Sequence, residues 1–398
     1  MRILSLSTQN EPCGIGDVNA ALQIAMQEQG HVYDVHRVTA EMRAAVSLAP
    51  YEAYLKAVET YDATLIQHEF GFFGPTHRRS MRNFSALISK IEAIGKPMLT
   101  VLHTNIPQKP ANRPLRWGSE SQKTRRAIKS FIRAMNRLAL ARFVVHGEAS
   151  RAAMIRNGLD PGRIIRIHLP MRDPRPLPLA GRGPDDRVTL GIFGFIADYK
   201  GYRNALEAML FLPERFHLRI VGSRHPKNVN DLTLNRILGM VHTGRWTDRP
   251  LEAPADTRLR ERVTLTGFVP DVAAALADVD IVLAPYTEHH PAGSAALSTS
   301  LSHGKPVIAS ATSSFVEVGN DGDCLKLVAL NAPFELAKAI EDLATDHGEM
   351  SRLSAAALDF SRRNSWDSCA RTFVEALQAG PHAGPRPSWF GLRRSLSL

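Results

Sequence analysis

Short apolar runs that end in polar or glycine-rich loops, each followed by a segment of helical periodicity, recur along this chain. Residues 281–284 form one such run, and the polar loop at residues 286–291 leads into a small-residue helix that opens at residues 293–296. Residues 304–306, Gly-Lys-Pro, end that helix and start the next apolar run. An apolar run of this length is typical of a strand buried in a parallel sheet. The repeat therefore predicts an α/β protein built from βα units.

The stretch at residues 285–310 also has the ordinary construction of an anion-binding site. A strand, a loop and a helix N-terminus with Gly293 follow one another. Free N–H groups and the positive end of the helix dipole would point at one spot there. On this stretch alone, a phosphate site and a purely structural βα unit both remain open.

The length of the chain predicts more than one domain. A chain of 398 residues is too long for one compact core, so we expect two domains. Residues 169–187 are rich in proline and glycine and lack a periodic apolar pattern, which indicates a linker. We therefore place an N-terminal domain at residues 1–168 and a C-terminal domain at residues 188–364. A helix at residues 365–379 is expected to cross back to the first domain, followed by a mobile basic tail at residues 380–398.

The composition of the chain indicates its cellular location and the kinds of partner it favours. The apolar fraction of 44% and the charged fraction of 22% are those of a globular protein. The three cysteines are scattered, no signal-peptide core opens the chain, and no apolar run approaches the ~20 residues that span a bilayer. We therefore expect a cytoplasmic protein. The formal charge of +10 favours an acidic partner, which includes nucleic acid, an anionic membrane surface and a phosphorylated substrate.

Two glycines near the start of the chain precede the first expected helix. Gly14 and Gly16 would let the backbone come close to a ligand. Asn19 stands where a dinucleotide fingerprint needs its third glycine, so this pattern disfavours a dehydrogenase.

Polar residues follow two later strands of the first half. His68 and Glu69 come directly after one apolar run, and His103 follows the next. Parallel sheets bind ligands at the carboxyl ends of their strands. These three side chains are therefore candidate site residues, and a structural role remains open for each.

The most basic segment lies at residues 113–142, where nine arginines and lysines face a single acid. One face of its expected helix carries four cations: Arg126, Lys129, Arg133 and Arg137. A solvated helix face and a helix attracted to anionic lipid, with Trp117 as an anchor, both remain open. Nucleic acid is less favoured as a partner because interleaved aromatic residues are lacking.

The second half repeats the same construction. A loop at residues 194–201 follows one strand, Gly222 follows another, and residues 267–270 follow a third. Asp278 and Asp280 resemble a metal motif, but they flank the start of a buried strand, so we interpret them as structural.

Seven of these segments, in this order, resemble the family 4 glycosyltransferases, and the resemblance extends over residues 2–377. The matching pieces read CGIGD, QHEFG, LHT, FGFIADYKG, TGFVPD, DIVLAPY and HGKPVIAS. The resemblance implies an α/β protein with two facing Rossmann-like domains, the GT-B fold, and a deep interdomain cleft. It also implies transfer of a sugar, usually with retention of the anomeric configuration.

The resemblance assigns roles by position. The loop at Gly14 and Gly16 would face the donor diphosphate, His103 would stand near the transferred sugar, and Lys200 would neutralise the diphosphate. It implies further donor contacts from six residues: Gly222, Phe268, Val269, Ser294, Ala295 and Ala296. His68 and Glu69 would lie on the acceptor side. Because a cation and a helix N-terminus would stabilise the leaving group, neither a metal nor another cofactor is expected.

The chain departs from the family at its donor site. The family usually has two glutamates in this loop and helix, and here Pro291 and Thr299 occupy their positions. Phe195 replaces the arginine that normally precedes the lysine. Glu288 lies three residues from the first expected position and is a candidate substitute, so we include it with His103 and Lys200 among the candidate catalytic residues.

Two main hypotheses follow. The first is a glycosyltransferase that moves a hexose from a nucleoside-diphosphate sugar to a cytoplasm-facing acceptor, such as a lipid-linked or polysaccharide intermediate, with attachment to the inner face of the membrane. The second is a catalytically degenerate relative that acts as a binding or scaffold protein. A different enzyme with two Rossmann domains, such as a sugar-nucleotide epimerase, is a third.

Overall fold

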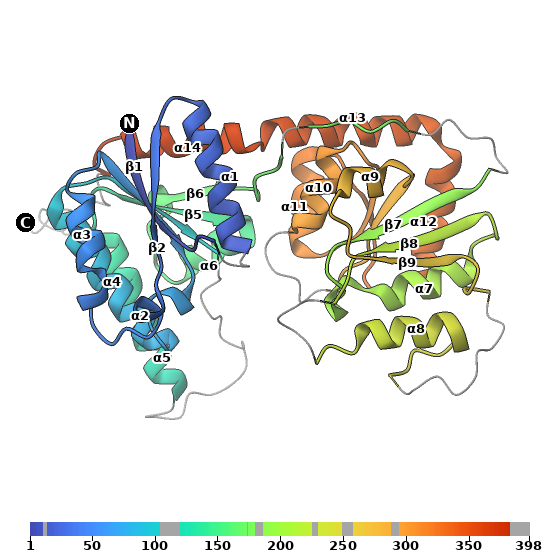
Figure 1. Cartoon of the computed structure of the whole chain (residues 1–398), viewed down its shortest axis with the longest axis horizontal. Coiled ribbons are helices and arrows are strands. Elements are labelled where there is room, and N and C mark those ends of the chain that lie inside the picture. Colours follow the sequence, from blue (N-terminus) through green and yellow to red (C-terminus); the bar gives the residue numbers. More distant parts are fainter. Residues whose placement is uncertain are drawn as a thin grey trace, which may run out of the picture. The chain divides into compact units, whose positions relative to one another are not determined.

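A computed structural model describes residues 1–10, 14–103, 120–172, 174–179, 186–224, 230–248, 258–287 and 294–382, without the side chains of residues 120–125. The chain divides into two compact units (Figure 1). Unit 1 comprises Met1–Ile167 and Trp366–Leu398, and unit 2 comprises His168–Ser365. Each unit contains one six-stranded sheet in which all paired strands are parallel. The prediction of an α/β fold built from βα units is confirmed.

The sheet of unit 1 has the strand order β2-β1-β3-β4-β5-β6. Its strands are β1 (Arg2–Ser7), β2 (Val32–Arg37), β3 (Ala63–His68), β4 (Met98–Leu102), β5 (Ala141–His146) and β6 (Ile164–Ile167). All residues of β3 and β4 are buried, because helices cover both faces of the sheet. The order reverses between β1 and β3, which makes the carboxyl ends of these two strands the expected ligand-binding edge.

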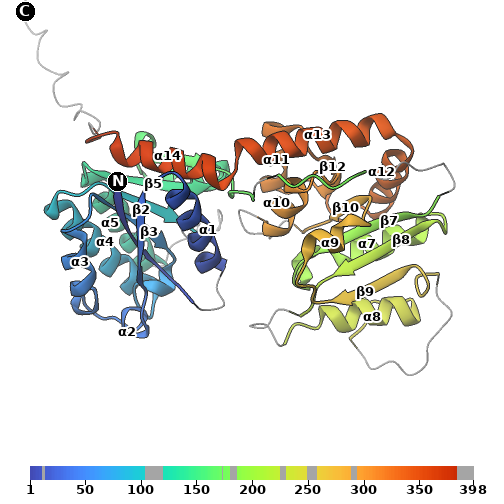
Figure 2. The same cartoon turned by 45° about the horizontal axis from the view of Figure 1, so that its top comes forward.

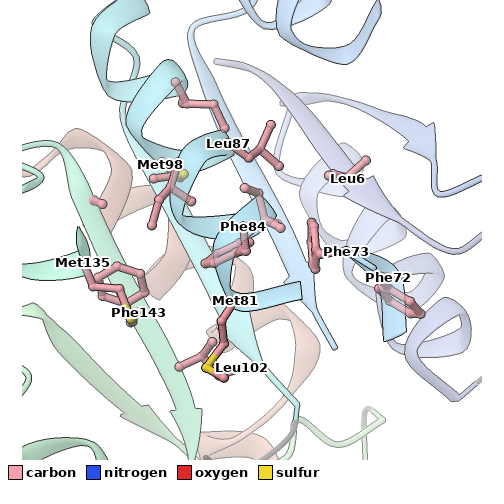
Figure 3. Close-up of a cluster of buried hydrophobic side chains, with 14 of the residues drawn as sticks. Leu6, Phe72, Phe73, Met81, Phe84, Leu87, Met98, Leu102, Met135 and Phe143 are labelled. Carbon is pink, nitrogen blue, oxygen red and sulfur yellow. The ribbon is translucent and has the colours of Figure 1, made fainter. Parts of the chain in front are cut away.

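Different helices cover the two faces of this sheet. Helices α1 (Gly14–Glu28) and α14 (Trp366–Gln378) pack on one face (Figure 2). On the other face lie α3 (Glu52–Val58), α4 (His77–Ile94) and α5 (Glu120–Arg137). Figure 3 shows part of this second core, in which Phe73 and Phe84 lie close together among methionine and leucine side chains. A short helix, α6 (Glu148–Arg156), connects β5 to β6.

The segment between β2 and β3 does not form one continuous helix. It consists of α2 (Ala40–Arg43), a 3₁₀ turn η1 (Ala49–Tyr51) and α3. Pro50 has no N–H group and stands at the start of η1, where that loss is tolerated. The Ser47 hydroxyl accepts a hydrogen bond from the Ala49 N–H at 3.4 Å, which favours a local turn over a continuous helix.

The sheet of unit 2 has the strand order β12-β11-β10-β7-β8-β9. Its strands are β7 (Val188–Phe193), β8 (Phe216–Val221), β9 (Val263–Gly267), β10 (Ile281–Ala284), β11 (Val307–Ser310) and β12 (Lys326–Val328). Counted within the unit, this is the order of a dinucleotide-binding Rossmann domain, and it reverses between β7 and β10. The carboxyl ends of β7 and β10 are therefore the expected ligand-binding edge of unit 2.

Helices cover both faces of this sheet as well. Helices α7 (Tyr202–Phe211), α8 (Thr233–Thr243) and α12 (Pro333–Thr345) pack on one face. The other face is covered by α9 (Val272–Ala277), α10 (Ala295–Ser302), α11 (Ser313–Gly322) and α13 (His347–Arg363). In the described part of the chain, no helix is both long enough and apolar enough to cross a lipid bilayer.

Part of the expected linker at residues 169–187 is attached to unit 2. The Met171 N–H donates to the Asn364 carbonyl at 2.9 Å, and the Arg175 N–H donates to the Ser302 carbonyl at 2.8 Å. The first residues after β6 therefore extend along unit 2.

Candidate functional site

Lys200 lies at the edge of unit 2 where the strand order reverses. It ends a 3₁₀ turn, η4 (Asp198–Lys200), that follows β7. Its side chain is only 4% exposed. The ammonium donates to the Phe193 carbonyl at 3.0 Å and lies 5.7 Å from the ring centroid of Tyr286, which follows β10. The switch point of the sheet thus places one buried cation between the two strand ends.

The charge of Lys200 has no carboxylate partner in the described part of the chain. Burial therefore lowers the pKa of Lys200 to about 8, because desolvation disfavours the ammonium. An unpaired buried cation is costly unless a ligand compensates it. This arrangement marks a candidate site for an anion.

Glycines make the close packing around Lys200 possible. Gly194 has a φ of +106°, and a Cβ there would lie 2.4 Å from the Lys200 ammonium and 3.6 Å from the Cβ of Ala296. A Cβ on Gly222 would lie 2.0 Å from the Gly194 carbonyl oxygen. Both positions therefore require glycine. Gly194 also shows that Lys200 and the first turn of α10 belong to the same small region.

The N-terminus of α10 presents free backbone donors. Ser294 caps the helix, and its hydroxyl accepts from the Leu297 N–H at 3.2 Å. The same hydroxyl lies 3.2 Å from the Tyr286 hydroxyl. Ala295 and Ala296 occupy the first turn, where N–H groups have no partner within the helix. Lys200 and α10 thus offer a cation and a positive helix end to one anion.

An exposed aromatic side chain follows β9. Phe268 is 71% exposed and Val269 is half-buried. Gly267 forms an antiparallel bridge with Gly222, which in turn contacts Gly194. Two glycines thus link Phe268 and Val269, which the resemblance assigns to donor contacts, to the region of Lys200. Phe195, in the position of the missing arginine, is 44% exposed.

In unit 1, His103 ends a chain of hydrogen bonds. Its Nε2 lies 2.7 Å from Oε1 of Gln67, and the Gln67 amide donates to Oδ1 of Asn19 at 3.2 Å. Asn19 Oδ1 also accepts from the hydroxyls of Ser5 at 2.9 Å and Tyr33 at 2.8 Å. Because the Gln67 NH₂ group faces Asn19, its oxygen faces His103 and requires a proton on Nε2. Nδ1 is then the acceptor of the ring.

The imidazole of His103 is neutral at physiological pH. Burial, with a smaller contribution from charge repulsion by His146 and His68, lowers the pKa of His103 to about 3. The rings of His103 and His146 are 5.5 Å apart between centroids. A neutral, oriented imidazole can accept a hydrogen bond from a hydroxyl group.

His68 and Glu69 are not a pair. His68 is fully buried in the core of unit 1, between the rings of Phe73 and Phe84. Burial lowers the pKa of His68 to about 3, so it is a neutral core residue. Glu69 caps the 3₁₀ turn η2 (Phe70–Phe72) and accepts from the Gly71 N–H at 2.6 Å. These contacts favour the structural alternative for both residues.

The glycines of the first loop open α1. Gly14 is the first residue of that helix, and Gly16 packs against Thr8, where a Cβ would lie 3.1 Å from the hydroxyl oxygen. The loop before them, at residues 11–13, lies outside the described residues, as do Trp117, Glu288 and Pro291. Thr299 is half-buried on α10. The four basic candidates Arg126, Lys129, Arg133 and Arg137 are exposed on α5.

The interpretation of Asp278 and Asp280 as structural agrees with their contacts. The carboxylate of Asp280 is buried and accepts from the Thr189 N–H at 2.7 Å. Asp278 is exposed and lies 3.5 Å from the guanidinium of Arg219.

Sequence reasoning missed several residues of these two regions. Asn19 was noted only as a missing glycine, although an amide on the apolar face of a helix signals a buried network. Tyr286 and Gly194 were not singled out, because nothing in the sequence indicates that their loops meet.

In the described residues, one cluster has the composition of a metal site. His168, Glu317 and Asp321 bring ligand atoms within 4.8 Å of one another. His168 Nε2 and Asp321 Oδ2 lie 2.8 Å apart, within hydrogen-bond distance. This cluster has no part in the donor site around Lys200.

Comparisons with known proteins agree with this geometry. Residues 187–346 match the sequence model of the family described as "Glycosyl transferases group 1". Among solved structures, HepE from Anabaena in complex with UDP is 17% identical, with 95% of this chain aligned to 100% of that one and a TM-score of 0.66. A glycosyltransferase from Rickettsia africae is 14% identical, with coverages of 95% and 98% and a TM-score of 0.68.

A third match is WaaG, described as a glycosyltransferase involved in lipopolysaccharide biosynthesis. It is 13% identical, with coverages of 96% and 100% and a TM-score of 0.57. A search of curated protein sequences finds no match. The chain therefore has the GT-B fold of two Rossmann-like units, as expected. The similarity in sequence to the glycosyl transferases of group 1 lies within unit 2, at residues 187–346.

Proposed function

We propose that the protein transfers a hexose from a nucleoside-diphosphate sugar to a hydroxyl group of an acceptor. The observation that carries this proposal is the buried Lys200 ammonium, which lacks a carboxylate partner in the described residues and lies beside the first turn of α10. HepE was solved with UDP and with UDP-glucose, so a uridine nucleotide is the first donor to test.

In the proposed step, the bond between the sugar C1 and the β-phosphate oxygen breaks. The electron pair stays with the nucleoside diphosphate, and the acceptor oxygen bonds to C1 and releases its proton to the departing phosphate oxygen. Negative charge builds on the leaving group, so Lys200 and the N–H groups of Ala295 and Ala296 would lower the barrier. They would supply the positive charge that a metal ion supplies in other transferases, and we propose retention of configuration.

His103 would hold the transferred sugar. Its Nε2 is committed to Gln67, and Nδ1 can accept from a sugar hydroxyl. Gly14 and Gly16 at the start of α1 would face the diphosphate. Phe268 and Val269 would form a wall for the nucleobase. Glu288 is a candidate to take the role of the family's two glutamates, whose positions are occupied here by Pro291 and Thr299.

For the acceptor, we propose a cytoplasm-facing lipid-linked or polysaccharide intermediate. The relatedness in fold to WaaG, described as acting in lipopolysaccharide biosynthesis, supports this class. The exposed cations Arg126, Lys129, Arg133 and Arg137 on α5 would attract the protein to an anionic membrane.

A thermal-shift screen with UDP, GDP and dTDP and their hexose conjugates tests the proposal. A nucleotide at a hundredfold its Kd stabilises the folded state by about 2.7 kcal/mol. We expect a shift with at least one nucleotide, and loss of that shift in Lys200→Met. Hydrolysis or transfer of the sugar, followed by chromatography, then tests turnover. The absence of any shift would favour a scaffold protein without donor binding.

A further inference from the structure

We propose that the groove between α4 and α5 of unit 1 binds the phosphate headgroup of an anionic membrane lipid. This inference deepens the membrane attachment within the proposed function and rests on it. The proposal assigns the attraction to anionic lipid to one defined site on unit 1. This site is separate from the donor site around Lys200.

Residues of both helices line the groove, from Arg78 to Ser89 on α4 and from Arg126 to Ala134 on α5. The two helices are neighbours over much of their length (Figure 1). The groove between them has a volume of about 600 Å³. That volume exceeds what a phosphate ion fills and matches the usual size of a site for a small organic ligand.

Three arginines line the groove. Arg78 and Arg82 are one helical turn apart on α4 and so share a face, and Arg126 comes from α5. All three are exposed. In the described part of the chain, neither Arg82 nor Arg126 has a carboxylate within ion-pair distance. A guanidinium group can donate two parallel N–H hydrogen bonds to the oxygens of one phosphate, so this set of side chains is complementary to a phosphate ester.

The floor of the groove is apolar. Met81 and Phe131 lie there, 2% and 1% exposed. Figure 3 shows Met81 at the edge of the hydrophobic cluster beneath α4. The hydroxyls of Ser85 and Ser89 donate to carbonyls of their own helix, at 2.6 Å and 2.8 Å. Five lining residues are apolar, namely Met81, Ala86, Ala127, Phe131 and Ala134, which suits the first carbons of an acyl chain.

Small side chains keep the groove open. Ala86 on α4 and Ser130 on α5 line it without filling it. A cationic rim above an apolar floor fits an anionic lipid better than a nucleotide, because none of the lining residues that the structure describes is a carboxylate that could hold a ribose. The exposed Lys129, Arg133 and Arg137 would contact neighbouring headgroups.

Co-sedimentation of the full chain with vesicles of phosphatidylglycerol and phosphatidylcholine tests the site. The variant Arg82→Glu with Arg126→Glu should bind about thirtyfold more weakly than wild type, because each basic residue near the surface contributes measurably to binding. Lys90→Glu with Arg137→Glu is the matched control. It reverses one charge on each of the same helices outside the groove, and we expect a loss at least about threefold smaller.

A second variant fills the groove with larger side chains and leaves the net charge of the protein unchanged. Ala86→Gln with Ser130→Gln should also weaken vesicle binding, whereas its melting temperature without vesicles should stay that of wild type. Equal losses in the two charge-reversal variants, or full binding by the glutamine variant, would overturn a defined groove site.

A competition experiment distinguishes the source of the phosphate. Inorganic phosphate and glycerol phosphate should compete with vesicles only weakly, since neither has an acyl chain. Displacement by either at the concentration of the lipid would contradict a lipid site. The UDP thermal shift tests the donor site separately. Vesicle binding without a thermal shift from UDP, GDP, dTDP or their hexose conjugates refutes the proposed transferase function, and a nucleotide shift without groove-dependent vesicle binding refutes only the groove.

Discussion

The ammonium of Lys200 lies 5.7 Å from the ring centroid of Tyr286, and the two residues come from the strand ends where the sheet order of unit 2 reverses. The Tyr286 hydroxyl in turn reaches the capping hydroxyl of Ser294, at 3.2 Å. A cation, an aromatic face and a helix N-terminus thus meet at one sheet edge. The charge of Lys200, the backbone packing around it and the hydrogen-bond network of unit 1 each have a measurable effect.

The affinity for UDP should depend on pH through Lys200. Burial lowers the pKa of Lys200 to about 8, and a bound diphosphate would raise it. The complex then keeps a proton that the free protein loses above pH 8. Affinity should therefore be full below pH 8 and fall as pH rises, by up to about tenfold per pH unit. Titration calorimetry between pH 7 and pH 9.5 measures this slope, with the pH range set by the pKa of about 8.

The control for this prediction is Lys200→Met, which has no titrating group at this position. Its affinity should be lower by about tenfold or more at pH 7, because the loss of a charged hydrogen-bond partner costs about 1.5–3 kcal/mol. It should show no fall above pH 8. A slope equal to that of wild type would assign the pH dependence to another group.

Replacing Gly201 by alanine should destabilise unit 2 strongly. Gly201 follows Lys200 with a φ of +70°, and a Cβ there would lie 1.8 Å from the Pro285 carbonyl oxygen. The left-handed conformation costs about 1–2 kcal/mol for alanine, and the clash with the backbone adds to it. We expect a loss of about 3 kcal/mol or more in the free energy of unfolding, measured by urea denaturation.

Gly267→Ala is the matched control in the same unit. Its φ is +72°, but nothing lies within 4 Å of the added Cβ. It should lose only the conformational term of about 1–2 kcal/mol. If the two variants unfold at the same urea concentration, the close approach of Gly201 to Pro285 does not contribute to stability.

The sequence predicts the strands of this protein better than its site. Runs such as residues 63–66 and 281–284 are buried on both faces of their sheets, so a plain apolar pattern identifies them. Because such strands are apolar on both faces, their sequence does not indicate which face of the sheet each side chain occupies. His68 therefore appeared as a possible ligand at a strand end, and it lies between phenylalanine rings. In a strand that is apolar throughout, alternation carries no information about direction.

The site itself depends on contacts between distant loops. Lys200 was predicted from its resemblance to a family motif, and the structure explains why it is exceptional: it is buried without a carboxylate partner in the described residues. The approach of Gly201 to Pro285 and of Gly222 to Gly194 brings its surroundings together. These approaches follow from the sheet order, which local sequence patterns do not specify.

Replacing Asn19 by alanine should destabilise unit 1. Three donors, from Ser5, Tyr33 and Gln67, share the Asn19 Oδ1 atom, and all three residues are buried. Each buried donor left without a partner costs about 1–3 kcal/mol, and we expect a total of about 3 kcal/mol. Ser5→Ala removes one donor and leaves the acceptor satisfied, so it should cost about 1 kcal/mol. Comparable losses in both variants, measured by urea denaturation, would argue against a shared network.

Gln67→Glu should turn His103 into a titrating group. The Gln67 oxygen lies 2.7 Å from His103 Nε2, so the substitution places a carboxylate beside the imidazole. An opposite charge at this distance raises the pKa of a histidine by about 1–3 units. The pKa of His103, about 3 in the native protein, should therefore rise towards 5 or more, and the imidazolium should persist below the raised pKa. Nitrogen NMR of labelled histidine measures this shift, with Gln67→Met as the uncharged control of similar size. A His103 signal that remains neutral down to pH 4 in Gln67→Glu would show that the hydrogen bond does not couple the two side chains.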